Sequence, residues 1–168
     1  VLPYSRMGQL MEACVKHTGC EHFGLLVGQR SGISSLGSVG LAAAHSNTVG
    51  GALLELTHNF HLQDDGAQVF LEIHRDIAFI GYEIFAADTD GTACIYDGAV
   101  AILSELLRTL CGPGWKSLEV CLRRRRPKNE GAYRGYFRAP ILFDAEKSGL
   151  YFDAKHLTAS VSNVDPFI

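Results

Sequence analysis

Residues 23–53 read FGLLVGQRSGISSLGSVGLAAAHSNTVGGAL, a stretch rich in glycine and other small residues. Glycine permits close backbone approach and positive φ, and it lowers the propensity for regular helix and strand. A flexible loop would explain the composition, but single apolar residues recur at regular intervals, which favours folded structure. The stretch therefore predicts short helices that pack tightly on their neighbours. The seven glycines are Gly24, Gly28, Gly32, Gly37, Gly40, Gly50 and Gly51.

Length and composition indicate one globular domain over residues 1–168. The chain is 47% apolar and 20% charged, which is ordinary for a globular protein. A net charge of −3 gives no basic field that would attract nucleic acid. No apolar run is long enough to span a bilayer, and no signal peptide is recognisable. The five scattered cysteines predict free thiols in a reducing cytoplasm: Cys14, Cys20, Cys94, Cys111 and Cys121.

Helical periodicity appears in four places. The first helix has its stripe at Met7, Leu10, Met11, Cys14 and Val15 and is expected to stop at Gly19. A short second helix is expected over residues 23–27. A third follows the cap-type residues 46–48, with apolar positions 49, 53, 56 and 60. The clearest stripe occupies positions 96, 100, 103, 107 and 110 and fits either a core helix or an interface helix.

Strand patterns occupy most of the remaining chain. Residues 69–74 alternate, and residues 77–85 follow after Arg75-Asp76, which predicts a hairpin whose second strand lies inside the sheet. Residues 88–91 are expected to form a turn. A third strand is predicted over residues 118–124 with Leu118, Val120 and Leu122 facing the core. A polar connector and a second hairpin, made by residues 140–144 and 150–153, are predicted to follow. The fold class is α+β: a single mostly antiparallel sheet of about five strands with helices packed on one side.

Four consecutive arginines, residues 123–126, form the most distinctive charged motif. A solvated strand end would explain them. The period of two instead places Arg124, and Arg126 if the strand continues, on the core face. An arginine at the edge of an apolar interior requires an anionic partner, either an Asp or Glu of the chain or an incoming ligand. We therefore take Arg124 and Arg126 as candidate contacts to an acidic group of a small effector.

Aromatic residues surround this motif. Trp115 precedes it, and Tyr133, Tyr136 and Phe137 follow it. Aromatic side chains line many ligand pockets, and they also fill protein cores. We predict these four as further ligand-binding candidates, with the core as the alternative.

Catalytic and metal-binding patterns are weak. Cys14, His17, Cys20 and His22 lie close together in sequence, but their spacing is not a recognised zinc motif. Asp64 and Asp65 are predicted as solvated loop residues. The sequence suggests no nucleophile–base arrangement, phosphate loop or dinucleotide fingerprint. We therefore predict no catalytic residues, no metal and no cofactor.

The order of these motifs resembles the N-terminal effector-binding domain, often labelled "arabinose-binding", of AraC-type transcriptional regulators. The resemblance begins with Phe23-Gly24, Gly28, Leu36-Gly37, Gly40, Thr48 and Ala52-Leu53. It continues through residues 120–127 (VCLRRRRP), Tyr133, Tyr136-Phe137, Pro140 and Phe143-Asp144. The family commonly carries histidine where this chain has Arg124, and glycine where it has Arg138. Both departures bear on ligand charge if this region touches the ligand.

The resemblance implies a non-enzymatic sensor in the bacterial cytoplasm that binds a small effector or forms a homodimer. It further implies control of a C-terminal pair of helix-turn-helix motifs, expected after Asp165-Pro166, which would make all contacts with DNA; no membrane partner is implied. The residues suggest an anionic effector as one option. Two other function classes stay open: a small cytoplasmic enzyme using Arg124 on an acidic substrate, and a metal or redox sensor built on Cys14, His17 and Cys20.

Overall fold

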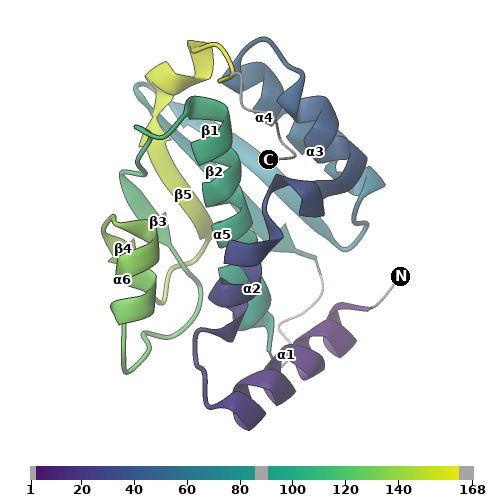
Figure 1. The fold of residues 1–168 in the computed structure, drawn as a ribbon, viewed down its shortest axis with the longest axis vertical. Coiled ribbons are helices and arrows are strands. Elements are labelled where there is room, and N and C mark those ends of the chain that lie inside the picture. The colour runs from purple at the N-terminus through teal and green to yellow at the C-terminus, as the bar shows by residue number, and fades with distance from the viewer. Residues whose placement is uncertain (1–2, 86–90, 163–168) are drawn as a thin grey trace.

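The computed structural model describes residues 3–85 and 91–162, and Figure 1 shows its ribbon. Helices in the N-terminal half are α1 (Tyr4–Thr18), α2 (Phe23–Ser31), α3 (Gly37–Ala44) and α4 (Val49–Asn59), with short 3-10 turns η1 (Ile33–Leu36) and η2 (Phe60–Leu62). The hairpin β1 (Ala67–His74) and β2 (Ile77–Ile84) leads to the long helix α5 (Thr92–Cys111). The remaining elements are β3 (Glu119–Cys121), α6 (Gly131–Phe137), β4 (Ile141–Leu142), β5 (Ser148–Asp153) and η3 (Ala154–Thr158).

The helix ends follow the local sequence rules. Gly19 ends α1 in the left-handed conformation, with φ of 67°. Thr48 caps α4, because its side-chain oxygen accepts a hydrogen bond from the Gly51 N–H at 3.1 Å. The predicted second helix is longer than expected and ends at Ser31. Of the predicted turn at residues 88–91, positions 88–90 lie outside the described residues.

The five strands form one sheet in the order β1-β2-β5-β3-β4. The predicted α+β class is confirmed, and so is the interior position of β2, which lies between β1 and β5. Helices pack on one face, where α5 crosses in front of the strands (Figure 1). The core lies between α5 and this face. The α5 stripe is core, since Tyr96, Val100, Leu103, Leu107 and Leu110 are all buried.

The predicted second hairpin is wrong. β4 and β5 do not pair, because β3 lies between them and pairs with β4 in parallel and with β5 antiparallel. A parallel pair needs a crossover connection, and α6 supplies it within the stretch predicted as a polar connector. The third strand is also shorter than predicted. Val120 and Leu122 are buried as expected, but Leu118 is 49% exposed.

The glycine-rich stretch does pack short helices tightly, as predicted. Helix α2 presents Gly24 and Gly28 to α5. A Cβ atom at Gly24 would lie 2.0 Å from the Cys94 carbonyl oxygen, and one at Gly28 would lie 2.4 Å from that of Gly98. Only glycine fits at such a backbone-to-backbone contact. The α2–α5 distance is therefore fixed by residues without side chains.

Candidate functional site

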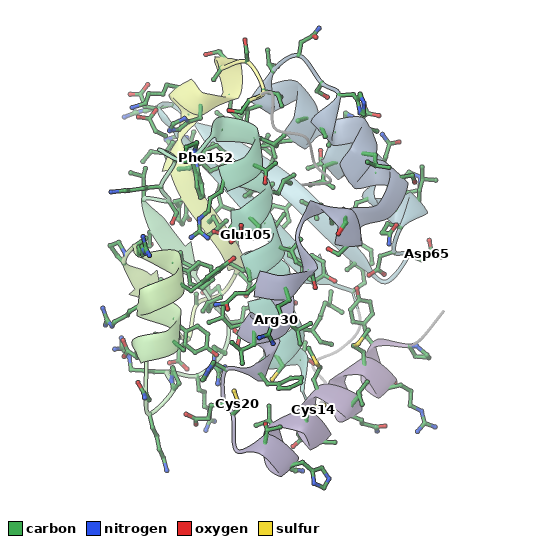
Figure 2. All side chains as sticks on the ribbon, viewed as in Figure 1. Cys14, Cys20, Arg30, Asp65, Glu105 and Phe152 are labelled. Carbon is green, nitrogen blue, oxygen red and sulfur yellow. The ribbon has the colours of Figure 1, made fainter. Side chains whose placement is uncertain are left out.

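A cavity of about 640 Å³ lies between the helices and the sheet. Its walls come from α1, α2, α5, η2 and the β1–β2 hairpin. The buried residues Leu36, Phe60, Val69, Tyr82 and Leu103 line its inner part. Asp65, labelled in Figure 2, belongs to the rim on the loop between η2 and β1. Its volume lies in the range of small-molecule sites.

Helix α1 covers the cavity more than it packs on the core. Gly8 is its single fully buried residue, and a Cβ on Gly91 would lie 2.0 Å from the Gly8 carbonyl oxygen. The apolar side chains Met7 and Met11 line the cavity instead of filling a core position. Of the predicted stripe, Met7 and Met11 thus face the cavity, whereas Leu10 is 55% exposed and is not part of the lining.

A hydrogen-bonded group of three polar residues meets the cavity, whose lining also includes the polar side chains of Ser35, His61, Gln63 and Asp65. Tyr4 on α1 donates a hydrogen bond to the Asp64 carboxylate, and its hydroxyl lies 2.5 Å from the hydroxyl of Tyr82 on β2. The second carboxylate oxygen of Asp64 accepts the Gly66 N–H at 2.9 Å. Burial is the main cause that raises the pKa of both phenols, so both stay protonated at neutral pH. We call these three residues the polar pole of the cavity.

Sequence reasoning missed the polar pole. The prediction that Asp64 is a solvated loop residue is wrong, since Asp64 is half-buried and bonded to Tyr4. The adjacent Asp65 is exposed, as expected. Tyr4 and Asp64 are 60 positions apart, and Tyr4 and Tyr82 are 78 apart, so no local spacing connects them.

Arg124 lies in a different place, a buried cluster away from this cavity. Its guanidinium donates to Asp97 on α5 at 2.6 Å, to the Glu21 carbonyl at 3.1 Å and to the Tyr133 hydroxyl. Tyr133 in turn donates to Asp97 at 2.7 Å. Asp97 is fully buried, and burial raises the pKa of its carboxyl to about 6, although Arg124 and Tyr133 act in the opposite direction. The anionic partner that the sequence required for Arg124 is present within the chain.

The other predicted site residues are distributed over two places. Arg126 is at the surface and forms an ion pair with Glu130 at 2.5 Å. Trp115, Tyr136 and Phe137 line a second cavity of about 610 Å³ beside α6, together with Arg108 and Arg138. Contact of Arg124, Arg126, Tyr133 or these three aromatic residues with a ligand stays a prediction.

The candidate metal ligands do not come together in the described part of the chain. Throughout residues 3–85 and 91–162, no three His, Cys, Asp or Glu side chains come together in a way that could hold a metal ion. Cys14 lies on α1, and Cys20 lies in the loop that follows it, both labelled in Figure 2. All five cysteines are free thiols. In the described part of the chain, no helix is long and apolar enough to cross a membrane.

Comparison with known proteins decides the family. The family described as "Arabinose-binding domain of AraC transcription regulator, N-term" matches residues 1–161. The chain belongs to this family. A search of curated proteins finds no match to the sequence. Among solved structures, the chain is similar to the transcriptional regulator CdpR from Pseudomonas aeruginosa, with a TM-score of 0.72 and 20% identity over 84% of this chain.

As an N-terminal AraC-type domain, the chain is a ligand-sensing regulatory domain. It spans about 46% of the length of the CdpR chain that it matches. The likeness to CdpR supports the fold and agrees with the α+β arrangement of the described residues.

Proposed function

We propose that the cavity between α1, α2, α5 and the sheet binds the effector of an AraC-type transcription regulator. The observation that carries the proposal is the cavity itself: about 640 Å³, mostly apolar, with one convergent polar group. Sites of this composition are the usual form of small-molecule pockets. The 610 Å³ cavity is a weaker candidate, because a larger share of its lining is polar, with the charged side chains of Arg108, Lys116 and Arg138 among it.

Under this proposal the effector acts by shifting a conformational equilibrium. A ligand changes the population of two arrangements only if its affinity for them differs. Helix α1 is the element best placed to respond, since its apolar side chains contact the cavity and few of its residues are buried. The bound domain would then control a C-terminal helix-turn-helix domain in the bacterial cytoplasm, and that second domain would make the contacts with DNA.

A cavity-filling variant tests the proposal. Ala99 lines the cavity from α5, and Ala99→Leu would occupy part of its volume without touching the polar pole. The matched control is Ala42→Leu, at an exposed position on α3 away from the lining. A thermal-shift screen of small metabolites would first identify a compound that raises the melting temperature of the wild type by mass action.

The expected result is loss of that shift in Ala99→Leu and its retention in Ala42→Leu. A shift that survives Ala99→Leu but is lost on Trp115→Ala would favour the predicted aromatic site beside α6 and contradict the proposal. A screen in which no compound raises the melting temperature of the wild type would also count against it.

A further inference from the structure

The polar pole has already used its hydrogen-bond donors. Tyr4 donates its single hydroxyl proton to Asp64, so the proton between the two phenols must come from Tyr82. The free capacity of the group consists of lone pairs on Asp64 and on the Tyr82 oxygen. A ligand that reaches this group must therefore supply the hydrogen-bond donor.

The charged residues at the cavity also favour a ligand that donates a hydrogen bond. Among the described residues, the ionisable side chains that line it, apart from the two phenols, are Asp64, Asp65 and His61, and none is a lysine or arginine. His61 is exposed, and its Nδ1 is engaged with the His58 carbonyl at 2.9 Å. A carboxylate or phosphate ligand would lose its hydration here without gaining a cationic partner. A cationic ligand would instead find the Asp64 carboxylate within the cavity wall.

The rest of the lining is suited to an apolar body. Val27, Ile95, Ile102 and Leu103 contribute aliphatic side chains from α2 and α5. Met7 and Met11 of α1 add flexible thioethers, which adapt to irregular ligand shapes. Burial of apolar surface would supply most of the affinity, and the polar pole would orient the head.

We propose that the effector is an amphipathic molecule with an apolar body and one hydrogen-bond-donating head, an amine in preference to an alcohol. This inference rests on the proposed function, since it names the ligand class of the same cavity. The amine is preferred because a hydrogen bond between an ammonium and a carboxylate is charge-assisted and stronger than a neutral one. This class of ligand, with a hydrogen-bond-donating head, differs from the anionic effector that the sequence suggested.

Three probes with eight carbon atoms each test which head group the protein of 168 residues prefers. Octylamine, octanol and octanoate each have eight carbon atoms, with the alkyl body of octanoate one carbon shorter, and they differ in donor capacity and charge. We expect binding by isothermal titration calorimetry in the order octylamine, octanol, octanoate, with octylamine at least about tenfold tighter than octanoate, as one charged hydrogen bond allows. Ala99→Leu should weaken all three.

The variant Asp64→Asn tests whether the Asp64 carboxylate causes the preference for the amine. It keeps the shape of the side chain and removes the charge, so the preference for octylamine over octanol should fall by about tenfold. The control is Asp76→Asn, which removes the same charge at an exposed turn outside the lining and should leave the preference unchanged.

The outcomes separate the two proposals. Octanoate binding tightest, with Ala99→Leu still weakening it, would overturn the donor-head inference and leave the cavity as the effector site. Octylamine binding that is unaffected by both Ala99→Leu and Asp64→Asn would place the amine elsewhere and overturn the inference as well. If compounds from a wider screen bind only away from the cavity, the proposed function itself fails.

Discussion

Gly28→Ala should destabilise the domain, because the added methyl group has no room between α2 and α5. Its Cβ would lie 2.4 Å from the Gly98 carbonyl oxygen and 2.6 Å from the Ala101 Cβ, whereas ordinary contact begins near 3.4 Å. Helix α2 must therefore move outward by about 1 Å, which loosens the packing of the fully buried Leu25. Such overpacking costs about 1–3 kcal/mol, and the gain of about 1 kcal/mol in helix propensity offsets only part of it.

The matched control is Gly135→Ala in α6, where an added Cβ meets no atom within 4 Å. At this position only the higher helix propensity of alanine acts, and we expect the free energy of unfolding to increase by about 0.5–1 kcal/mol. Urea denaturation followed by circular dichroism gives both free energies of unfolding. The net cost of Gly28→Ala is up to about 2 kcal/mol, so this variant should be less stable than Gly135→Ala by up to about 3 kcal/mol. Equal stabilities for Gly28→Ala and Gly135→Ala would refute the claim that glycine is required at this helix contact.

Three further predictions concern a helix cap, a buried carboxyl and the first helix. Thr48→Ala removes the cap of α4 and should cost about 1 kcal/mol in urea denaturation, while Thr48→Ser should retain most of it. Because burial raises the pKa of Asp97 from 3.8 to about 6, the folded state binds more protons than the unfolded state between these values. Stability should therefore decrease as the pH rises through this interval, by up to about 3 kcal/mol, and Asp97→Asn should remove that part of the slope; an unchanged slope would contradict it. Tyr4→Phe removes the bonds to Asp64 and Tyr82, so hydrogen exchange should accelerate in α1 and stay unchanged in α5; equal acceleration in both helices would show that the polar pole does not hold α1 specifically.

Elements with several periods of a local pattern were predictable from sequence. The α5 stripe covers more than four turns, and the β1–β2 hairpin joins two eight-residue strands across a short polar break. By contrast, α6 has seven residues and β4 has two, so neither carries a readable period. The parallel β3–β4 pair was unpredictable for the same reason, since it depends on the crossover through α6.

The candidate site was likewise predictable from the sequence only in part. The chemistry of Arg124 predicted a carboxylate partner, but Asp97 is 27 positions away on α5 and could not be identified from spacing. The cavity depends on three segments that the fold brings together around Tyr4, Asp64 and Tyr82. Periodicity locates apolar faces, but it does not reveal whether a face meets another helix or a cavity.

The glycines of α2 connect the fold to the proposed sensing role. Gly28 and Gly98 line the cavity and also set the separation of α2 and α5, so the contact that fixes the helices also shapes the cavity. Helix α1 then lies over a cavity where a fully packed domain would place core side chains. A ligand that fills this space would add the apolar contacts that α1 lacks, and its binding free energy would stabilise the docked arrangement of α1 by mass action. Under the proposed function, the incomplete packing of α1 would couple effector concentration to the position of a helix.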